Sequence, residues 1–360
     1  MITVDTRNTK LAKDPAQDLV LPSGTLAIKP RQFWYSDLTN IVIPDTVKSI
    51  GESAFECCTK LTSITIPDSV TSIGNEAFAH CDKLTTIIIG NSVESIGEGA
   101  FAHCNSLTSI VIPDSVKSIG KSAFANSINL TNVTMGNNVV TIGDDAFYSC
   151  SNLTTLNIPN SVTSIGERAF YDCTNLKSIV LPDGLSKIDK LAFCNCTSLT
   201  SVAIPDSVTN IGYAHFANCR NLTTVTIGSK VNSITPSMFK YCSSLTNITI
   251  PDSVTSIGSF AFYYCHSLTN ITIGNGVKRI EDCAFWDCKN LTSITIPDSI
   301  ARIGKYVFDD CTSLIEIRYK GTQSQWRSIT KAYGWNRGTG RYKIICTDGI
   351  LPKNPSQLRN

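Results

Sequence analysis

Hydrophobic positions recur along the chain with a period of 23 residues. In the block from Cys58 to His80, Leu61, Ile64 and Ile66 follow an L-x-x-I-x-I spacing. One buried position followed by alternation is the pattern of a short strand with a single buried face. The block is therefore predicted to begin with a strand.

The rest of the block predicts a return path and two corners. A Pro-Asp pair at 67–68 ends the strand, because proline cannot donate to the next ladder rung. Val70 and Ile73 are expected to point inward on the return path, and Gly74 to form the next corner. Residues 77–78 are expected on a short helical or 3₁₀ turn that leads into the following block.

Three columns of nearly identical residues run through these blocks without insertion or deletion. The phenylalanine column is Phe55, Phe78, Phe101, Phe124, Phe147, Phe170, Phe193, Phe216, Phe239, Phe262, Phe285 and Phe308. The isoleucine column is Ile50, Ile73, Ile96, Ile119, Ile142, Ile165, Ile188, Ile211, Ile234, Ile257, Ile280 and Ile303. The cysteine column is Cys58, Cys81, Cys104, Ser127, Cys150, Cys173, Cys196, Cys219, Cys242, Cys265, Cys288 and Cys311. A constant period of this length predicts one coil of a stacked solenoid per block.

The repeat unit resembles the BspA-like branch of the leucine-rich-repeat family. The segment from Leu61 to Cys81, L-T-S-I-T-I-P-D-S-V-T-S-I-G-x-x-A-F-x-x-C, matches that branch's consensus almost letter for letter, and the resemblance covers about Leu38 to Tyr319. It implies a right-handed leucine-rich-repeat solenoid, mainly β with short helical or 3₁₀ turns. About 12–13 coils with terminal caps are expected. Trp326 and Ile329 look like part of the family's C-terminal cap.

Three segments are expected on this basis. Residues 1–37 are predicted to form an N-terminal cap and a degenerate first coil, residues 38–319 the leucine-rich-repeat solenoid, and residues 320–360 a C-terminal cap with a basic tail. A terminal cap is physically required, because a bare last coil would expose its sheet edge and its core.

The cysteine column is predicted to consist of buried thiols that donate weakly to loop carbonyls. Identical side chains stacked at a strand spacing of about 4.8 Å have parallel Cβ vectors, which do not meet the geometry of a disulfide. Ser127 fills one position without interrupting the repeat. No pair of cysteines has zinc-site spacing, so no metal site is expected.

Composition narrows the function further. Charged residues make up 17% of the chain and the net charge is +2, which indicates no general affinity for nucleic acid. No apolar run approaches the length of about 18 residues that spans a bilayer, so no membrane insertion is expected. Nucleophile motifs, H-E-x-x-H, phosphate-binding loops and dinucleotide fingerprints are all absent. The chain is accordingly interpreted as a protein without enzymatic activity or cofactors.

Two surfaces are candidates for binding. The position after the phenylalanine column, and the next one, become aromatic in several coils. These residues are Tyr148, Tyr171, Tyr241, Tyr263, Tyr264 and Trp286. Exposed aromatic side chains suit contact with a protein or a glycan, and the cluster around Tyr263, Tyr264 and Trp286 is preferred. The alternative is the sheet face, where Thr226, Thr249, Thr272 and Thr295 form a file.

The resemblance implies a non-enzymatic binding scaffold that acts as a cell-surface or secreted adhesin or host-protein interaction protein. Its partner would be a protein or a glycan. Residues 1–20 lack the apolar core of a secretory signal, which keeps open a cytoplasmic location as an intracellular interaction module or effector. A purely structural spacer is the third possibility.

Overall fold

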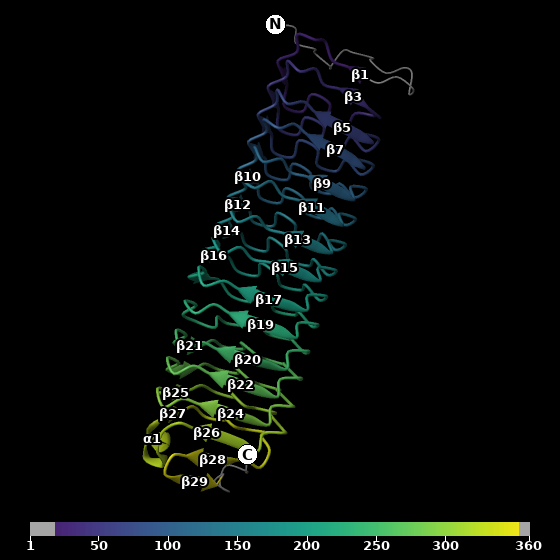
Figure 1. The fold of residues 1–360 in the computed structure, drawn as a ribbon. Coiled ribbons are helices and arrows are strands. Elements are labelled where there is room, and N and C mark those ends of the chain that lie inside the picture. Colours follow the sequence, from purple (N-terminus) through teal and green to yellow (C-terminus); the bar gives the residue numbers. More distant parts are fainter. Residues whose placement is uncertain (1–18, 353–360) are drawn as a thin grey trace. The chain divides into compact units, whose positions relative to one another are not determined.

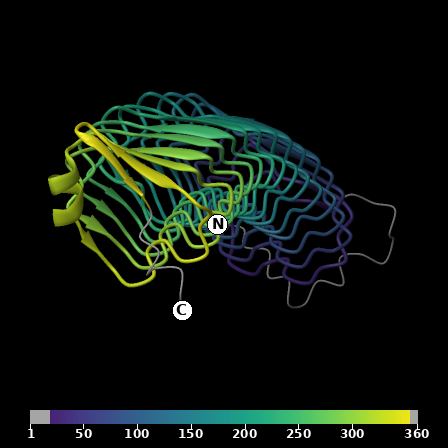
Figure 2. The same cartoon turned by 90° about the horizontal axis from the view of Figure 1, so that it is seen from below.

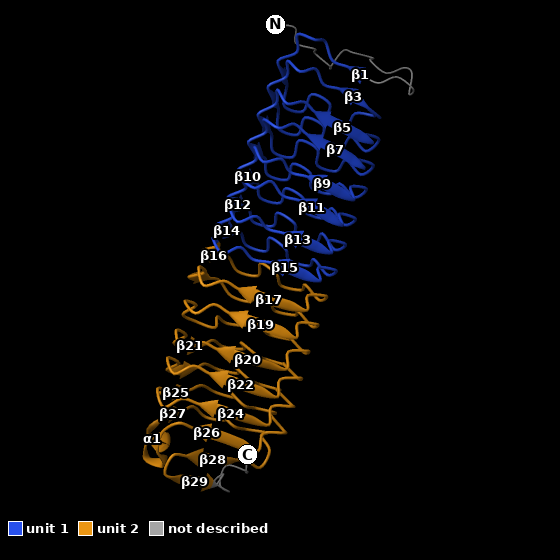
Figure 3. Ribbon diagram, in the orientation of Figure 1, with its two compact units in different colours: residues 1–184 blue, residues 185–360 orange. Residues whose placement is uncertain are grey.

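The computed structural model describes residues 19–352 and divides into two compact units, residues 1–184 and 185–360 (Figure 3). Both units are parallel-strand solenoids, with about 14 turns in the described residues. Most coils contribute a first strand of two to four residues and a second strand of two residues on the opposite side of the core (Figure 1). The predicted solenoid is confirmed. There is slightly more than the expected 12–13 coils, because segments beyond the three columns also form turns.

Apart from the first coil, where Leu19 pairs with Ile41 and Ala27 with Ser49 at an offset of 22 residues, the strands of unit 1 follow the 23-residue period. Its first strands are β1 (Leu19–Val20), β3 (Ile41–Val42), β5 (Ser63–Ile66), β7 (Thr86–Ile89), β9 (Ser109–Val111), β11 (Asn132–Thr134), β13 (Thr155–Asn157) and β15 (Ser178–Val180). Its second strands are β2 (Ala27–Ile28), β4 (Ser49–Ile50), β6 (Ser72–Ile73), β8 (Ser95–Ile96), β10 (Ser118–Ile119), β12 (Thr141–Ile142) and β14 (Ser164–Ile165). Pairing is parallel and keeps the sequence register, as where Ile110 faces Val133.

Unit 2 repeats this arrangement. Its first strands are β17 (Ser201–Ile204), β19 (Thr224–Ile227), β20 (Asn247–Ile250), β22 (Asn270–Ile273), β24 (Ser293–Ile296), β26 (Glu316–Tyr319) and β28 (Lys343–Cys346), and β28 continues through a hairpin into β29 (Gly349–Pro352). Its second strands are β16 (Lys187–Ile188), β18 (Asn210–Ile211), β21 (Ser256–Ile257), β23 (Arg279–Ile280), β25 (Arg302–Ile303) and β27 (Thr330–Lys331). β29 pairs antiparallel with β28, unlike the other described pairs.

The core is built from the columns that the sequence repeats. Leu61, Ile64 and Ile66 are buried while Ser63 and Thr65 are exposed, as the alternation predicts. The phenylalanine rings stack at centroid distances of 5.0–5.5 Å from Phe33 to Phe170 in unit 1. They stack at 5.3–5.9 Å from Phe193 to Phe308 in unit 2. Each ring shields its neighbours from water, so burial is continuous within each unit.

The corner around residues 74–81 is a chain of turns, so the prediction of a helical or 3₁₀ turn there was wrong. Ala79 N donates to Glu76 O at 3.1 Å, but Phe78 N donates across to Ala100 O of the next coil at 2.8 Å. Local and inter-coil bonds alternate in this way along the segment. The alternation requires a left-handed backbone at Glu76 (φ 54°) and His80 (φ 58°), which no helix tolerates.

The C-terminal coils of unit 2 carry the one helix in the described range, α1 (Gln323–Ser328), seen beside the last strands in Figures 1 and 2. Thr322 and Gln325 close a capping box at its N-terminus. Trp326 is buried and lies 6.0 Å from Trp335, which packs edge-on against Phe308 at 6.1 Å. These rings cover the end of the phenylalanine stack.

The cysteine column adds a second donor to a backbone carbonyl of the corner; Phe78 O, for example, already accepts from Cys81 N at 3.3 Å. Cys104 Sγ donates to Phe78 O at 3.3 Å, and the same bond recurs in other coils with lengths of 3.0–3.3 Å. Ser127 makes it with its hydroxyl, to Phe101 O at 3.0 Å. Burial raises the pKa of the Cys104 and Cys150 thiols to about 12. No disulfide joins the fifteen cysteines, all of which lie within residues 19–352. The prediction of buried donor thiols is confirmed.

Ser127 offers a direct test of this hydrogen bond. Ser127→Ala removes the donor to Phe101 O and also the acceptor for Cys104 N, which lies 3.2 Å from the Ser127 hydroxyl. We expect the free energy of unfolding to fall by about 1–3 kcal/mol, because both backbone groups are left buried and unpaired. Ser127→Cys restores the column and should cost clearly less in the same urea titration. Equal losses in the two variants would show that the bond contributes nothing.

Thiol accessibility provides a second test. Cys57 and Cys194 are half-buried, whereas the other cysteines are buried. In native protein we expect a thiol reagent to modify these two first, and the column cysteines only after denaturation, because burial suppresses the reactive thiolate. Mass spectrometry of timed samples measures the order. Rapid native modification of Cys104 or Cys150 would contradict the packing described here.

The buried histidine predicts a pH dependence of stability. His215 occupies the position that is alanine in most coils and is fully buried, which lowers its pKa from 6.5 to about 4. Below about pH 6.5 the His215 imidazole binds a proton in the unfolded chain but stays neutral in the folded chain. The free energy of unfolding therefore decreases as the pH falls from about 6.5 to about 4. We expect wild type to lose about 2 kcal/mol between pH 7.5 and pH 5 relative to His215→Met.

Methionine is the matched replacement, because Met238 fills the same position in the next coil. Urea titrations of both proteins at the two pH values give the difference, which cancels the titration of all other groups. Parallel losses in wild type and variant would remove His215 as the cause.

Candidate functional site

Aromatic side chains gather on the corners of four consecutive coils in unit 2. They lie in three columns at whole-repeat intervals, on the segments 237–241, 260–264, 283–287 and 306–310. We call the resulting surface the aromatic corner patch, defined by Tyr241, Phe260, Tyr263, Tyr264, Trp286 and Tyr306. All of these side chains are half-buried or exposed.

The rings of the patch form one connected cluster around Tyr263. Its centroid lies 5.6 Å from Tyr241, 5.6 Å from Phe260, 4.4 Å from Tyr264 and 5.5 Å from Trp286. Most of these contacts are edge-to-face or tilted, which is the favoured geometry between aromatic rings. Edge-to-face packing leaves ring faces directed outward or toward a neighbouring group.

A cation already lies against three of these faces. The ammonium nitrogen of Lys240 lies 5.1 Å from the centroid of Tyr241, 5.7 Å from Phe260 and 5.2 Å from Tyr263. Lys240 occupies the same repeat column as Tyr263 and Trp286, so stacking of coils brings the ammonium to the rings. An ammonium within about 6 Å of a ring face is attracted by the ring's quadrupole.

Carboxylates border the patch on the side toward the C-terminus. Asp287 Oδ2 lies 2.8 Å from His266 Nε2, and Lys289 Nζ lies 3.3 Å from Asp287 Oδ1. The indole N–H of Trp286 donates to Asp310 Oδ2 at 3.4 Å. Burial raises the pKa of the Asp309 carboxyl. The patch thus combines apolar faces with negative charge.

The phenol of Tyr263 stays neutral at physiological pH. Burial, followed by the neighbouring Tyr264, raises its pKa to about 12. A neutral phenol keeps its hydroxyl as a hydrogen-bond donor at the centre of the patch.

Four residues of the patch have a left-handed backbone. Tyr241, Phe260, Tyr264 and Tyr306 have φ of 62°, 60°, 60° and 55°. Other coils place Ser122, Asn126 and similar small or polar residues at the equivalent positions. Bulky side chains at positive φ cost free energy, and such strain concentrates at functional sites.

The structure brings together Tyr241, Tyr263, Tyr264 and Trp286, four of the six aromatic residues predicted from the sequence. Tyr148 and Tyr171 lie in unit 1, where their rings stack at 5.3 Å beside the ion pair of Arg168 with Asp145. That pair is smaller than the unit 2 patch. It remains a separate candidate.

The sequence analysis missed Phe260, Tyr306 and Lys240. Phe260 and Tyr306 occupy the column two residues before the phenylalanine column, where most coils carry small or charged residues. Comparing the four corners column by column would have revealed Phe260 and Tyr306. Lys240 lies directly after Phe239, in a column already considered, but a lysine there carries no sign that it contacts the rings.

Unlike the aromatic corner patch, the threonine file of the sheet face consists of a single type of small side chain. Thr249, Thr272 and Thr295 are register partners in β20, β22 and β24. Thr226 lies in β19 and is exposed, as are Thr249 and Thr272. Side chains of this size provide no large anchor for a partner.

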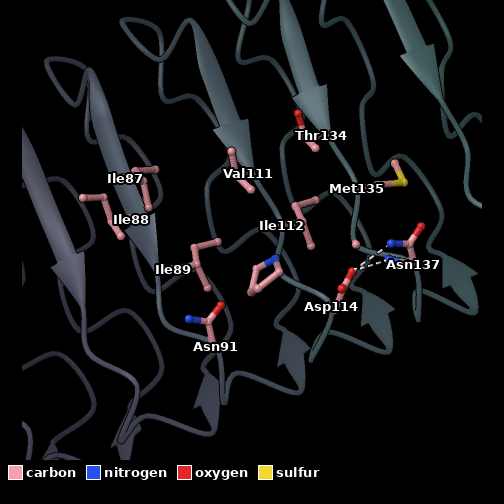
Figure 4. A pocket seen from close by; sticks show the side chains of 12 residues that line it. Ile87, Ile88, Ile89, Asn91, Val111, Ile112, Asp114, Thr134, Met135 and Asn137 are labelled. Atoms are coloured by element: carbon pink, nitrogen blue, oxygen red, sulfur yellow. Dashed lines mark hydrogen bonds between the residues drawn. The ribbon is translucent and has the colours of Figure 1, made fainter.

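Unit 1 carries a more apolar stretch of sheet face. Ile88 and Val111 are 56% and 63% exposed on adjacent coils. They rise beside a shallow hollow that ends at Asp114, whose carboxylate accepts from Asn137 N at 2.7 Å (Figure 4). The hollow is lined by Ile87, Ile88, Ile89, Asn91, Val111, Ile112, Pro113, Asp114, Thr134, Met135, Gly136 and Asn137. It is open and weakly shaped, with few convergent polar groups.

Within residues 19–352, no set of three or more His, Cys, Asp or Glu side chains is grouped so that it could hold a metal ion. In the same part of the chain, no helix has the length and apolarity needed to cross a bilayer.

Comparisons with known proteins identify the repeat. The family model for the BspA type leucine rich repeat region matches residues 26–154, 140–249 and 232–331. A leucine-rich repeat protein from Bacteroides ovatus is 30% identical, with a TM-score of 0.70 over 91% of this chain and 92% of that one. A leucine rich cell surface protein from Faecalibacterium prausnitzii is 31% identical, with a TM-score of 0.50 over 87% and 90%.

None of the curated proteins compared with the chain matches it. The family model alone spans most of the sequence, and the Bacteroides ovatus structure has the same parallel-strand architecture. The fold is of a kind suited to protein binding. The chain belongs to the BspA type leucine rich repeat family.

Proposed function

We propose that the chain is a non-enzymatic scaffold, presented at a cell surface or secreted, that binds a protein partner through the aromatic corner patch. The observation that carries the proposal is the gathering of six aromatic side chains on four adjacent corners. Tyrosine and tryptophan dominate the binding energy of protein interfaces because their rings bury large areas while keeping a polar handle.

Strain and exposure support this assignment. Phe260 and Tyr241 are 37% and 39% exposed although both have a left-handed backbone. A ring at such a position gains little from the core, which the phenylalanine column already fills. Contact with a partner would bury the exposed area and offset the backbone cost.

The surface location rests on similarity. The Faecalibacterium prausnitzii relative is described as a cell surface protein. At 31% identity over most of both chains, that description supports an extracellular role in adhesion or host-protein binding for this chain. An intracellular interaction module remains the alternative, and export of the native protein decides between them.

The proposal is tested by a paired substitution, Tyr263→Ser with Trp286→Ser. Two hot-spot rings are lost at once, so affinity for the partner should fall at least about 30-fold, the equivalent of 2 kcal/mol. Biolayer interferometry against purified host surface and matrix proteins, and in parallel a glycan array, measures the loss. Tyr148→Ser with Tyr171→Ser tests the unit 1 pair as the competing site, and it should leave the affinity unchanged if the partner binds the aromatic corner patch.

Circular dichroism and thermal unfolding establish that both paired variants are folded. Unchanged affinity in the Tyr263 and Trp286 variant would reject the patch as the binding site. If Thr249→Ala with Thr272→Ala abolishes binding instead, the site lies on the sheet face. Binding confined to the glycan array would reject the protein partner.

A further inference from the structure

The aromatic corner patch contains a cage of three rings that is filled by the chain's own lysine. Tyr241, Phe260 and Tyr263 surround the Lys240 ammonium at 5.1–5.7 Å. Phe260 comes from one corner column, Tyr263 from a second and Tyr241 from a third, on two adjacent coils. Rings facing one cation from three directions form the arrangement that recognises alkylammonium groups.

Within residues 19–352 no ion pair holds the Lys240 ammonium in addition to the rings. Its removal from the cage would therefore break no salt bridge, and the ammonium would return to water. The lysine stem is flexible, with four carbons between the backbone and the charge. Replacing the Lys240 ammonium in the cage by a second alkylammonium group therefore costs little free energy.

The surroundings favour an incoming cation. Asp310 is exposed and accepts from Trp286, whose ring contacts Tyr263 of the cage. The buried Asp287, in contrast, is already paired with Lys289 and His266. Negative charge next to ring faces strengthens attraction for a positive group and disfavours an anionic one. An incoming basic side chain would thus meet complementary charge as well as ring faces.

We infer that Tyr241, Phe260 and Tyr263 form a binding site for an alkylammonium group, that Lys240 masks this site, and that the partner supplies the lysine side chain that replaces it. This inference rests on the proposed function, since it specifies how the patch recognises a protein. Lys240 acts as an internal competitor, which lowers the apparent affinity for the incoming lysine.

The test removes the competitor. Full-length wild type and Lys240→Ala are titrated with Nα-acetyl-lysine N-methylamide, and binding is followed by the upfield ring-current shift of the probe's ε-methylene NMR signal. The variant should bind the probe in the millimolar range. Wild type should bind at least about tenfold more weakly, because an intramolecular group competes at a millimolar or higher effective concentration. Lys240→Gln serves as a second open-cage variant.

Two controls make the result specific. The same probe acetylated at its ε-nitrogen has no charge and should produce no shift. Adding Phe260→Ser to Lys240→Ala removes one wall of the cage and should weaken binding about tenfold, the effect of 1.4 kcal/mol of cation–π attraction. Serine is the matched residue, because Ser237 occupies the same column one coil earlier.

The contrary outcomes are distinct. Equal binding by wild type and both open-cage variants, or equal binding of the charged and acetylated probes, rejects the masked site. Tetramethylammonium binding without binding of the lysine probe rejects lysine as the source of the cation. A further outcome is that the lysine probe does not bind the open-cage variants while the Tyr263 and Trp286 variant still loses its partner. That combination rejects the lysine site and leaves the proposed function standing.

Discussion

Register between coils is the constraint on which the structure depends. Within each unit the corners donate alternate backbone N–H groups to the following coil, as Phe78 does to Ala100, and in the coils between the terminal ones the strands pair at an offset of 23 residues, as Ser63 does with Thr86. A change in length within one coil would leave two sets of bonds without partners and would separate the phenylalanine rings. The uniform repeat length therefore reflects the hydrogen bonding of the corners as much as the packing of the core.

The same bonding pattern determines which residues the corners accept. Two residues in each coil have a left-handed backbone, and polar or small residues such as Asn126 and Ser122 fill these positions at low cost. In unit 2 they become Phe260, Tyr264 and Tyr306. The aromatic corner patch thus uses positions whose geometry the scaffold enforces, and a scaffold held by many inter-coil bonds can absorb that strain.

Much of the fold was predictable from the sequence, because core columns repeat identical residues. The alternation of Leu61, Ile64 and Ile66 predicted the first strand, and the parallel stacking of the cysteine column, with Ser127 filling one position, predicted buried donor groups without disulfides. The corners were harder to predict. Their left-handed residues are mostly not glycine, so composition carries no signal of them. Lys240 could be recognised as part of the patch only from the distances that stacking creates.

Equal coil lengths also make whole coils exchangeable. Each coil presents to the next the same pattern of donors, acceptors and ring faces that it received from the previous one, as the recurring bonds from cysteine to phenylalanine carbonyls illustrate. Loss or duplication of one 23-residue block at the gene level would leave no mismatched junction within a unit. The site proposed over residues 237–310 is different in kind: recombination between its coils would separate the aromatic residues of the patch while the protein stayed folded. Chain length and binding specificity can therefore diverge independently in descendants of such a gene.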